Sequence, residues 1–330
     1  MTIGYHHLKL PSERSQFKNV KESYRTDIAP FLESLEQSRK TSVGGAAGIV
    51  AFTILFAIVF VAAGPFERAN AHVAILVGFA GSAAAGYLLS NFKQTVNDGL
   101  MARICQSLEY DYEPKLTRPS FVETYLRLKL LPRFNHEEWE DAVKGSYEGT
   151  NFSLCEANLK FETKGKKNQT RTVFHGQLLI IDYPKEFFGE TIIRRDAGIL
   201  NRLTKPGREF ANVGFASPIF EKAFEAWSTD QVEARTLLDP IVVERFQELD
   251  RLFKGAKLRA AFVDGKLMIT IETGDKLNAG SMFKPLDRPD RVETILKEFD
   301  LIFDLIDVIT ASIDRKIDEP VSIDNLRRSN

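Results

Sequence analysis

The stretch VGGAAGIVAFTILFAIVFVAAG, residues Val43–Gly64, decides the architecture because it is almost wholly apolar. It lies in a run from Thr41 to Phe66 that has no charged side chain, and a second such run extends from Ala69 to Phe92. A helix needs about 20 apolar residues to cross a hydrocarbon core roughly 30 Å thick, since each residue advances it by about 1.5 Å. The two runs therefore predict two transmembrane helices. The alternative is a pair of helices buried in a soluble core.

The flanks of these runs predict the orientation of the hairpin. Pro65–Ala71 leaves room only for a tight turn, so the two helices are antiparallel. The side shared by both termini holds the excess of basic residues, which marks the cytoplasm; these residues are Arg25, Arg39, Lys40, Lys93 and Arg103. We therefore expect a protein with two membrane spans and both termini cytoplasmic. We expect no cleaved signal peptide, because about 40 polar residues precede the first run.

Small residues recur in both runs at the spacing that lets helix backbones approach closely. Gly44 and Gly48 are four apart, and Gly78, Ser82 and Gly86 form a longer ladder. One interpretation is packing within the hairpin itself. The other is a homo-oligomer formed through the second helix.

The overall composition excludes several classes of function. The 330 residues carry 44 Lys and Arg against 45 Asp and Glu, and this balance argues against nucleic-acid binding by bulk positive charge. The two cysteines, Cys105 and Cys155, form no C-x-x-C pair, and we expect Cys155 to be a small buried thiol. The chain has no G-x-S-x-G, Walker or G-x-G-x-x-G motif. We therefore expect no cofactor and no metal.

Four segments follow from these patterns. They are a cytoplasmic tail and helix at 1–40, the transmembrane hairpin at 41–92, a helical stalk at 93–145 and a cytoplasmic domain at 146–330. The stalk is predicted to end with a helix over 136–144. In the last segment Asn151–Glu162 and Thr172–Asp182 alternate with period two, as strands do.

The same segment also contains helical patterns. Asp264-Gly265 separates two alternating stretches and predicts a β-hairpin, and Pro289–Ile317 is a long amphipathic helix. Phe224 and Phe246 are expected in the core. Strands and helices come in runs and do not alternate strictly, which favours an α+β fold of antiparallel strands packed with helices over a doubly wound sheet.

Taken together, these segments resemble a bacterial family of unknown function whose members are often labelled "galanin" in genomes. The resemblance is carried by four stretches: GTNFSLCEANL at Gly149–Leu159, VFHGQLLIIDYPKEFF at Val173–Phe188, FEKAFEAWSTDQVEARTLL at Phe220–Leu238 and AFVDGKLMITI at Ala261–Ile271. It implies a two-helix hairpin in the bacterial inner membrane followed by this domain. It implies no catalytic residues, since none is established for the family, and it implies a LemA-type membrane protein as a partner.

The strongest cluster of polar residues lies at the start of a predicted helix. Asp230 is expected to cap this helix, with Glu233 returning the bond as in a capping box. Arg235 and Asp239 are spaced as an i, i+4 ion pair, and these four residues form the candidate polar site. His175 is read as a core or interface histidine, and Asp300, Asp304 and Asp307 as a solvated helix face.

A basic loop, Thr163–Arg171, joins two of the predicted strands. Its four positive charges, Lys164, Lys166, Lys167 and Arg171, are candidates for contact with anionic lipid. The alternative is a flexible solvated turn.

Two functions are compatible with these patterns. The first is a membrane-anchored cytoplasmic protein that binds a protein partner or the membrane surface and is not an enzyme. The second is a membrane-associated enzyme that acts on a lipid or peptide through polar residues convergent only in three dimensions. The absence of a recognisable catalytic pair favours the first. A pocket gathering Asp230, Arg235, His175 or Asp239 would favour the second.

Overall fold

The structure is a computed structural model in which the chain forms two compact units. Unit 1 comprises Met1–Leu108 and Asn278–Lys297, and unit 2 comprises Glu109–Leu277 and Glu298–Asn330. The described residues are 8–318 with gaps at 64–66, 164–168, 196–205, 215–220, 222, 241, 245, 248–256, 275–276 and 278–279.

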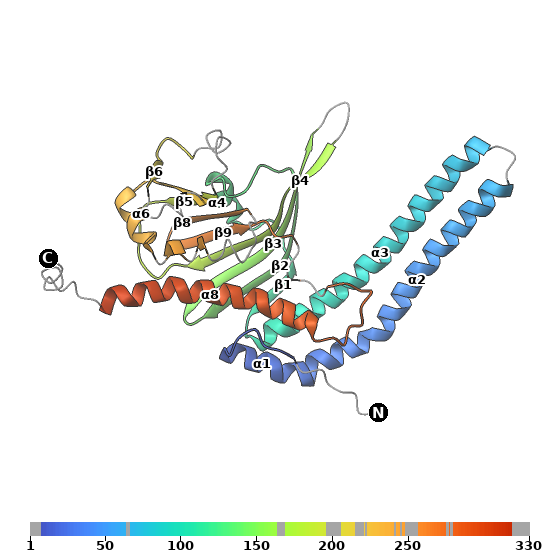
Figure 1. The fold of residues 1–330 in the computed structure, drawn as a ribbon, viewed down its shortest axis with the longest axis horizontal. Coiled ribbons are helices and arrows are strands. Elements are labelled where there is room, and N and C mark those ends of the chain that lie inside the picture. Colours follow the sequence, from blue (N-terminus) through green and yellow to red (C-terminus); the bar gives the residue numbers. More distant parts are fainter. Residues whose placement is uncertain are drawn as a thin grey trace, which may run out of the picture. The chain divides into compact units, whose positions relative to one another are not determined.

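Unit 1 is dominated by two long helices that run side by side (Figure 1). A short helix α1 (Ser15–Ser23) and a π-helical turn η1 (Tyr24–Ile28) lead into α2 (Ala29–Ala63), and α3 (Glu67–Ser107) returns along it. Both helices are long and apolar enough to cross a membrane. The polar helix expected before residue 41 is continuous with the apolar run, because no helix-breaking residue separates them. The second helix continues into the predicted helical stalk as far as Ser107.

The seam between α2 and α3 is built from small residues, although not from those of the predicted ladder. Its buried side chains belong to Ala46, Thr53, Ala74 and Ala85. A Cβ added at Gly81 would overlap the Thr53 side chain, so glycine is required there for the helices to approach. By contrast, a Cβ at Gly44, Gly48, Gly78 or Gly86 would meet nothing within 4 Å. Packing of these glycines within the hairpin is therefore wrong.

The polar end of the hairpin is tied together by aromatic and ionic contacts. The Arg103 guanidinium lies 3.7 Å from the centre of the Phe31 ring and pairs with Asp27 at 3.2 Å. A Cβ at Gly99 would overlap the Phe31 ring, so the two helices are in close contact here as well. Segment 280–297 belongs to the same unit and contacts α2 through Glu36 and Arg39.

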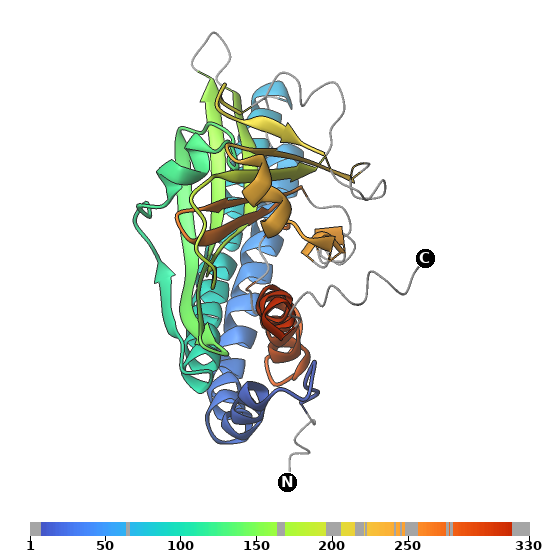
Figure 2. The ribbon, with the colours of Figure 1, turned by 90° about the vertical axis from the view of Figure 1, so that its left-hand side faces the viewer.

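Unit 2 contains a nine-stranded antiparallel sheet in the order β1-β2-β3-β4-β9-β8-β5-β7-β6 among the described residues. Figure 2 shows the long strands β2 to β4 running at a marked angle to the shorter strands at the other end, as the twist of a large sheet requires. The strands are β1 (Asp111–Lys115), β2 (His136–Tyr147), β3 (Thr150–Thr163), β4 (Gln169–Asp182), β5 (Thr191–Arg195), β6 (Ala211–Val213), β7 (Phe224–Ser228), β8 (Leu258–Val263) and β9 (Lys266–Ile271). The predicted α+β class and antiparallel sheet are confirmed.

The helical prediction for 136–144 was wrong, because this segment is strand β2. A β-bulge shifts its register between Glu140 and Val143, and Asp141 has a φ of 50°. The bulge shifts the period-two alternation by one residue, so the buried residues Trp139 and Val143 lie on opposite faces of the sheet although they are four apart in sequence. Residues 93–145 are therefore helical only in part, with α3, β1 and the short helix α4 (Val122–Arg127) preceding β2. Pro114 is tolerated in β1 because this strand lies at the edge of the sheet.

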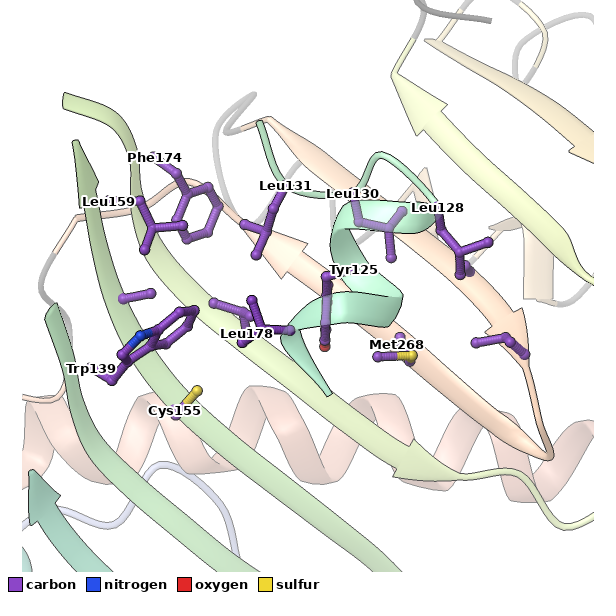
Figure 3. Close-up of a cluster of buried hydrophobic side chains, with 14 of the residues drawn as sticks. Tyr125, Leu128, Leu130, Leu131, Trp139, Cys155, Leu159, Phe174, Leu178 and Met268 are labelled. Carbon is purple, nitrogen blue, oxygen red and sulfur yellow. The ribbon is translucent and has the colours of Figure 1, made fainter. Parts of the chain in front are cut away.

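Each face of the long strands is covered by a different element. On one face α4 and residues 128–131 pack on a core that includes Cys155, Leu178 and Met268 (Figure 3). On the other face α8 (Asp290–Asp318) contributes Phe303, whose ring stacks on Tyr147 at 4.4 Å between centroids. Helix α6 (Gln231–Leu237) follows β7. The hairpin at Asp264-Gly265 and the amphipathic C-terminal helix are both confirmed.

Candidate functional site

A cavity of about 630 Å³ opens in unit 2, next to α4 on the long strands. It is lined by Glu109, Asp111, Phe121, Thr124, Lys144, Gly145, Asn151, Phe152, Ser153, Ile180, Asp182, Val263, Asp264, Lys266 and Met268. Its volume falls in the range of about 300–1,000 Å³ that is typical of small-molecule sites.

Strand register places many of the lining side chains on one face of the sheet. Asp111 is opposite Lys144, Lys144 is opposite Ser153, and Ser153 is opposite Ile180. Ile180 in turn is opposite Met268, so one row of side chains crosses five strands. Side chains two residues apart share a face of a strand, and the neighbouring row therefore holds Asn151, Asp182 and Lys266.

A hydrogen-bonded cluster rims one end of the cavity. The Lys266 Nζ donates to Asp182 Oδ1 at 2.8 Å, and Asn151 Nδ2 donates to Asp182 Oδ2 at 3.1 Å. The hydrogen bond from Lys266 lowers the pKa of Asp182 below its ordinary value. Lys266 is fixed by the β8–β9 turn, in which Asp264 and Gly265 have φ values of 49° and 69°, as a type I′ hairpin requires.

Lys144 is the distinctive charge of the cavity. Its ammonium has no hydrogen-bond or ion-pair partner within the described part of the chain, although Asp111 lies on the adjacent strand. Four carboxylates, those of Glu109, Asp111, Asp182 and Asp264, lie around the same opening. The apolar side of the lining comes from Phe121, Ile180, Val263 and Met268. The cavity therefore joins an apolar wall to charges of both signs.

The chemistry of the lining is suited to binding. It includes the hydroxyls of Thr124 and Ser153 but no histidine or cysteine that would activate them. Nowhere in the described ranges do three His, Cys, Asp or Glu side chains gather as a metal site would need. The opposite charges and the apolar wall can instead orient a small amphipathic molecule.

The predicted polar cluster lies elsewhere, at the start of α6, and none of its four members lines the cavity. Asp230 caps α6 as predicted, since its Oδ1 accepts from the backbone N–H of Val232 at 2.9 Å and of Glu233 at 3.0 Å. Asp239 is buried and accepts from the N–H of Val242 at 3.0 Å, which caps the next helical turn. Arg235 is exposed.

The capping-box role expected of Glu233 was wrong. Its carboxylate accepts from the N–H of Phe188 at 2.8 Å and from the N–H of Gly189 at 2.6 Å. The N–H of Asp230 donates to the Ser228 hydroxyl at 3.1 Å. A tertiary loop thus supplies the donors that Glu233 would otherwise have taken from its own helix. Glu233 fixes residues 188–189 before strand β5, which is a structural role.

The other candidates are distributed over the fold. His175, read as a core or interface histidine, is exposed on β4 and is therefore not a core residue. Cys155 is buried as predicted, and burial raises the pKa of its thiol to about 12. Arg171 is exposed on β4, while Lys164, Lys166 and Lys167 lie outside the described residues.

The aspartates of the C-terminal helix are only partly solvated. Asp304 is exposed, whereas Asp300 and Asp307 are half-buried. The Asp307 carboxylate accepts from the Tyr147 hydroxyl at 3.3 Å. The solvated face predicted for these three residues is therefore correct for Asp304, and Asp307 faces the sheet.

The cavity residues were missed because the sequence was searched for clusters that are close along the chain. Lys144, Asp182 and Lys266 are far apart in sequence and line one cavity only because strand pairing brings their strands together. A signal was nevertheless present. On β3, the polar residues Asn151 and Ser153 share a face with apolar side chains. On β4, the polar residue Asp182 shares a face with the apolar Ile180.

Fold and cavity define an α+β protein with two long apolar helices and a cavity of small-molecule size. Comparison with known proteins adds that the family described as "Protein of unknown function (DUF3137)" matches residues 172–310, which supports the resemblance to a family of unknown function. No curated protein matches the chain. A solved structure, the mycobacterial trehalose monomycolate transport factor A, TtfA, is similar over 62% of this chain and 90% of that chain. At 13% identity and a TM-score of 0.32, this likeness does not establish a shared fold.

Proposed function

We propose that the protein is anchored in a membrane by the α2–α3 hairpin and acts as a binding protein through unit 2. The observation that carries the anchor is the exposure of the hairpin. Only 6% of the most apolar window of the first helix and 11% of that of the second are buried. Phe52, Leu76 and Phe79 are each more than 65% exposed. Helices in a soluble core would bury these side chains, and an apolar surface of this extent needs lipid around it.

The dimensions of the hairpin support the same proposal. Residues 41–63 of α2 are free of charge and extend over about 34 Å at 1.5 Å per residue, enough for a hydrocarbon core of about 30 Å. A Cβ added at Gly45 would lie 3.6 Å from the Leu88 side chain, so these two residues face each other across the seam. Five residues further toward the polar end of each helix, Lys40 and Lys93 are therefore level with each other and mark one boundary of the bilayer.

The proposal places the protein in the bacterial inner membrane with both termini in the cytoplasm, because the basic residues gather at that boundary. A reporter that is active only in the periplasm tests this orientation. It should give no signal when fused after Asn330 and a strong signal when inserted after Pro65. The chain should also stay in the membrane pellet after an alkaline carbonate wash. Release by carbonate contradicts the anchor, and a strong signal at Asn330 contradicts the orientation.

The binding role is proposed for the cavity, which is suited to a small molecule with an apolar part and a zwitterionic or mixed polar part. Ile180→Trp should fill the cavity from its wall. The control is Val232→Trp, because Val232 is 75% exposed on α6 and does not line the cavity. Mass spectrometry of small molecules released from the purified full chain should show a species lost in Ile180→Trp and retained in the control. Identical profiles for both variants and the wild type would refute the role of the cavity.

Self-association through Gly78, Ser82 and Gly86 is a further part of this proposal. Gly78 and Gly86 face open space, so a second hairpin could approach them closely. Ser82→Cys should form a disulfide-linked dimer in oxidised membranes, and Ala85→Cys should not, because Ala85 is buried in the seam. Equal crosslinking of both variants would argue against this interface. The LemA-type partner stays a prediction.

The alternative function, a membrane-associated enzyme, can be tested separately. The cavity gathers none of Asp230, Arg235, His175 and Asp239, the residues whose convergence would have favoured it. An enzyme that uses the cavity would have to act through Lys144 and the surrounding carboxylates. Turnover of a lipid or peptide that is abolished by Lys144→Met would favour that alternative over binding alone.

A further inference from the structure

A loop at the polar end of the hairpin exposes an aromatic ring between two buried neighbours. In the segment Gly280–Leu286, Met282 and Leu286 are buried, whereas Phe283 is 72% exposed. Lys284 and Pro285, which follow it, are exposed as well. This loop belongs to unit 1 with the hairpin, although it lies some 170 residues after α3 in the sequence.

Two contacts fix the level of the loop along α2. The Arg39 Nη1 donates to the carbonyl of Met282 at 2.9 Å, and the N–H of Leu286 donates to Glu36 Oε2 at 3.0 Å. Arg39 and Glu36 are themselves joined at 2.8 and 2.7 Å, and Arg39 is buried. Arg39 precedes the charge-free run at Thr41 by two residues, or about 3 Å of helix. The loop therefore lies at the boundary between the charged and apolar parts of the hairpin.

A second arginine holds the shape of the loop from within. The Arg291 Nη2 donates to the carbonyls of Ser281 at 2.7 Å and Lys284 at 2.8 Å, and its Nε donates to the carbonyl of Pro285 at 3.3 Å. Arg291 is buried, and this desolvation lowers its pKa. The exposed ring thus stands on a backbone whose conformation is fixed by hydrogen bonds on both sides.

We propose that Phe283 and Lys284 form a second contact with the bilayer, in which the ring enters the interfacial layer and the ammonium meets lipid phosphate. This inference rests on the proposed membrane anchor. Single exposed apolar residues are common on soluble surfaces and need no partner. Phe283 differs because it is held level with the boundary of an apolar surface that the hairpin already presents to lipid. Aromatic rings and Lys side chains are both favoured at this depth of a membrane.

The contact has a consequence for the connections between the units. The chain passes from unit 1 to unit 2 after Leu108, returns after Leu277 and leaves again after Lys297. If Phe283 is inserted, the returning segment is attached both to the hairpin and to the lipid. Helix α8, which starts at Asp290 in this segment, would then begin at the membrane surface.

Cysteine labelling of the full chain in nanodiscs tests the proposal, because both native cysteines are buried. Phe283→Cys is labelled with an environment-sensitive nitrobenzoxadiazole fluorophore. Asn19→Cys serves as the aqueous control, since Asn19 is exposed on α1. Helix α1 precedes the start of α2 at Ala29, which is itself about 15 Å of helix from Arg39. Phe79→Cys serves as the lipid control, since Phe79 is 73% exposed on α3.

The label at 283 should emit at shorter wavelength than the label at 19, should be at least about threefold less quenched by aqueous iodide, and should be quenched by lipids with a spin label near the headgroup. Iodide quenching equal to that of the label at 19, with the label at 79 protected, would overturn the inference and leave the membrane anchor intact. Iodide quenching of the label at 79 would overturn the anchor and the inference together.

Discussion

Replacing Phe224 by Ala tests the packing of unit 2. Phe224 is 1% exposed, and its ring lies edge-on to that of Phe246 at 6.4 Å between centroids, a contact between two residues predicted to meet in the core. Removing a fully buried phenyl ring loses its transfer free energy and leaves a cavity. The free energy of unfolding should therefore fall by about 3–5 kcal/mol. The matched control is Phe188→Ala, because Phe188 is 93% exposed and should lose less than about 0.5 kcal/mol.

Tryptophan fluorescence during urea unfolding reads out this unit alone. The chain has two tryptophans, Trp139 and Trp227, and both belong to unit 2. With a denaturant slope of about 2.5 kcal/mol per molar urea, the midpoint for Phe224→Ala should drop by roughly 1–2 M. A loss below about 1 kcal/mol, or equal losses for Phe224→Ala and Phe188→Ala, would refute the packing described for β7.

Three further predictions concern single groups in the same unit. Tyr125→Phe should lower the free energy of unfolding by about 1 kcal/mol, because the buried hydroxyl donates to the carbonyls of Leu179 at 2.9 Å and Ile269 at 3.3 Å. Since burial raises the pKa of Tyr125 well above 10.0, wild-type stability should also fall more steeply than that of the variant as pH rises above 10. Parallel stability curves against pH would contradict this. Lys266→Met should raise the pKa of Asp182 toward 3.8 in a carboxyl titration followed by NMR. Because a lowered folded-state pKa stabilises the protein only above the pKa of the unfolded state, the small stability difference between wild type and variant should be present at neutral pH and vanish in acid. An unchanged pKa of Asp182 would refute the pairing. Gly176→Ala should destabilise unit 2 by more than about 2 kcal/mol in the same urea assay, because an added Cβ would overlap the carbonyl of Ile271, and a neutral effect would show that β4 and β9 can separate there.

Much of the fold was readable from local patterns. The two apolar runs, the alternation in β3 and β4, and the Asp264-Gly265 turn each depend on residues close in sequence, and each prediction is confirmed as secondary structure. Asp230 was also recognised as a cap because the donors it satisfies, Val232 and Glu233, follow it directly in the chain.

The errors arose where a distant segment changed the local outcome. Trp139 and Val143 are four residues apart, a spacing compatible with a helix as well as with a strand, and only pairing with β3 decides that this segment is strand β2. Glu233 left its expected partner because the loop at 188–189 presents two backbone donors to it. Of the two interpretations of the glycine ladder, packing within the hairpin is wrong, because Gly81 and its small neighbours occupy that seam.

The sequence by itself determined the two long apolar helices and the α+β class, because charge-free length and period-two alternation depend only on neighbouring residues. The tertiary structure alone decided the candidate site. Lys144, Asp182 and Lys266 line one cavity because strand register aligns their strands. The Gly280–Leu286 loop reaches Arg39 because Met282, 243 residues later in the chain, folds back onto α2. Local propensity cannot specify such contacts, since it carries no information about which distant segments pair.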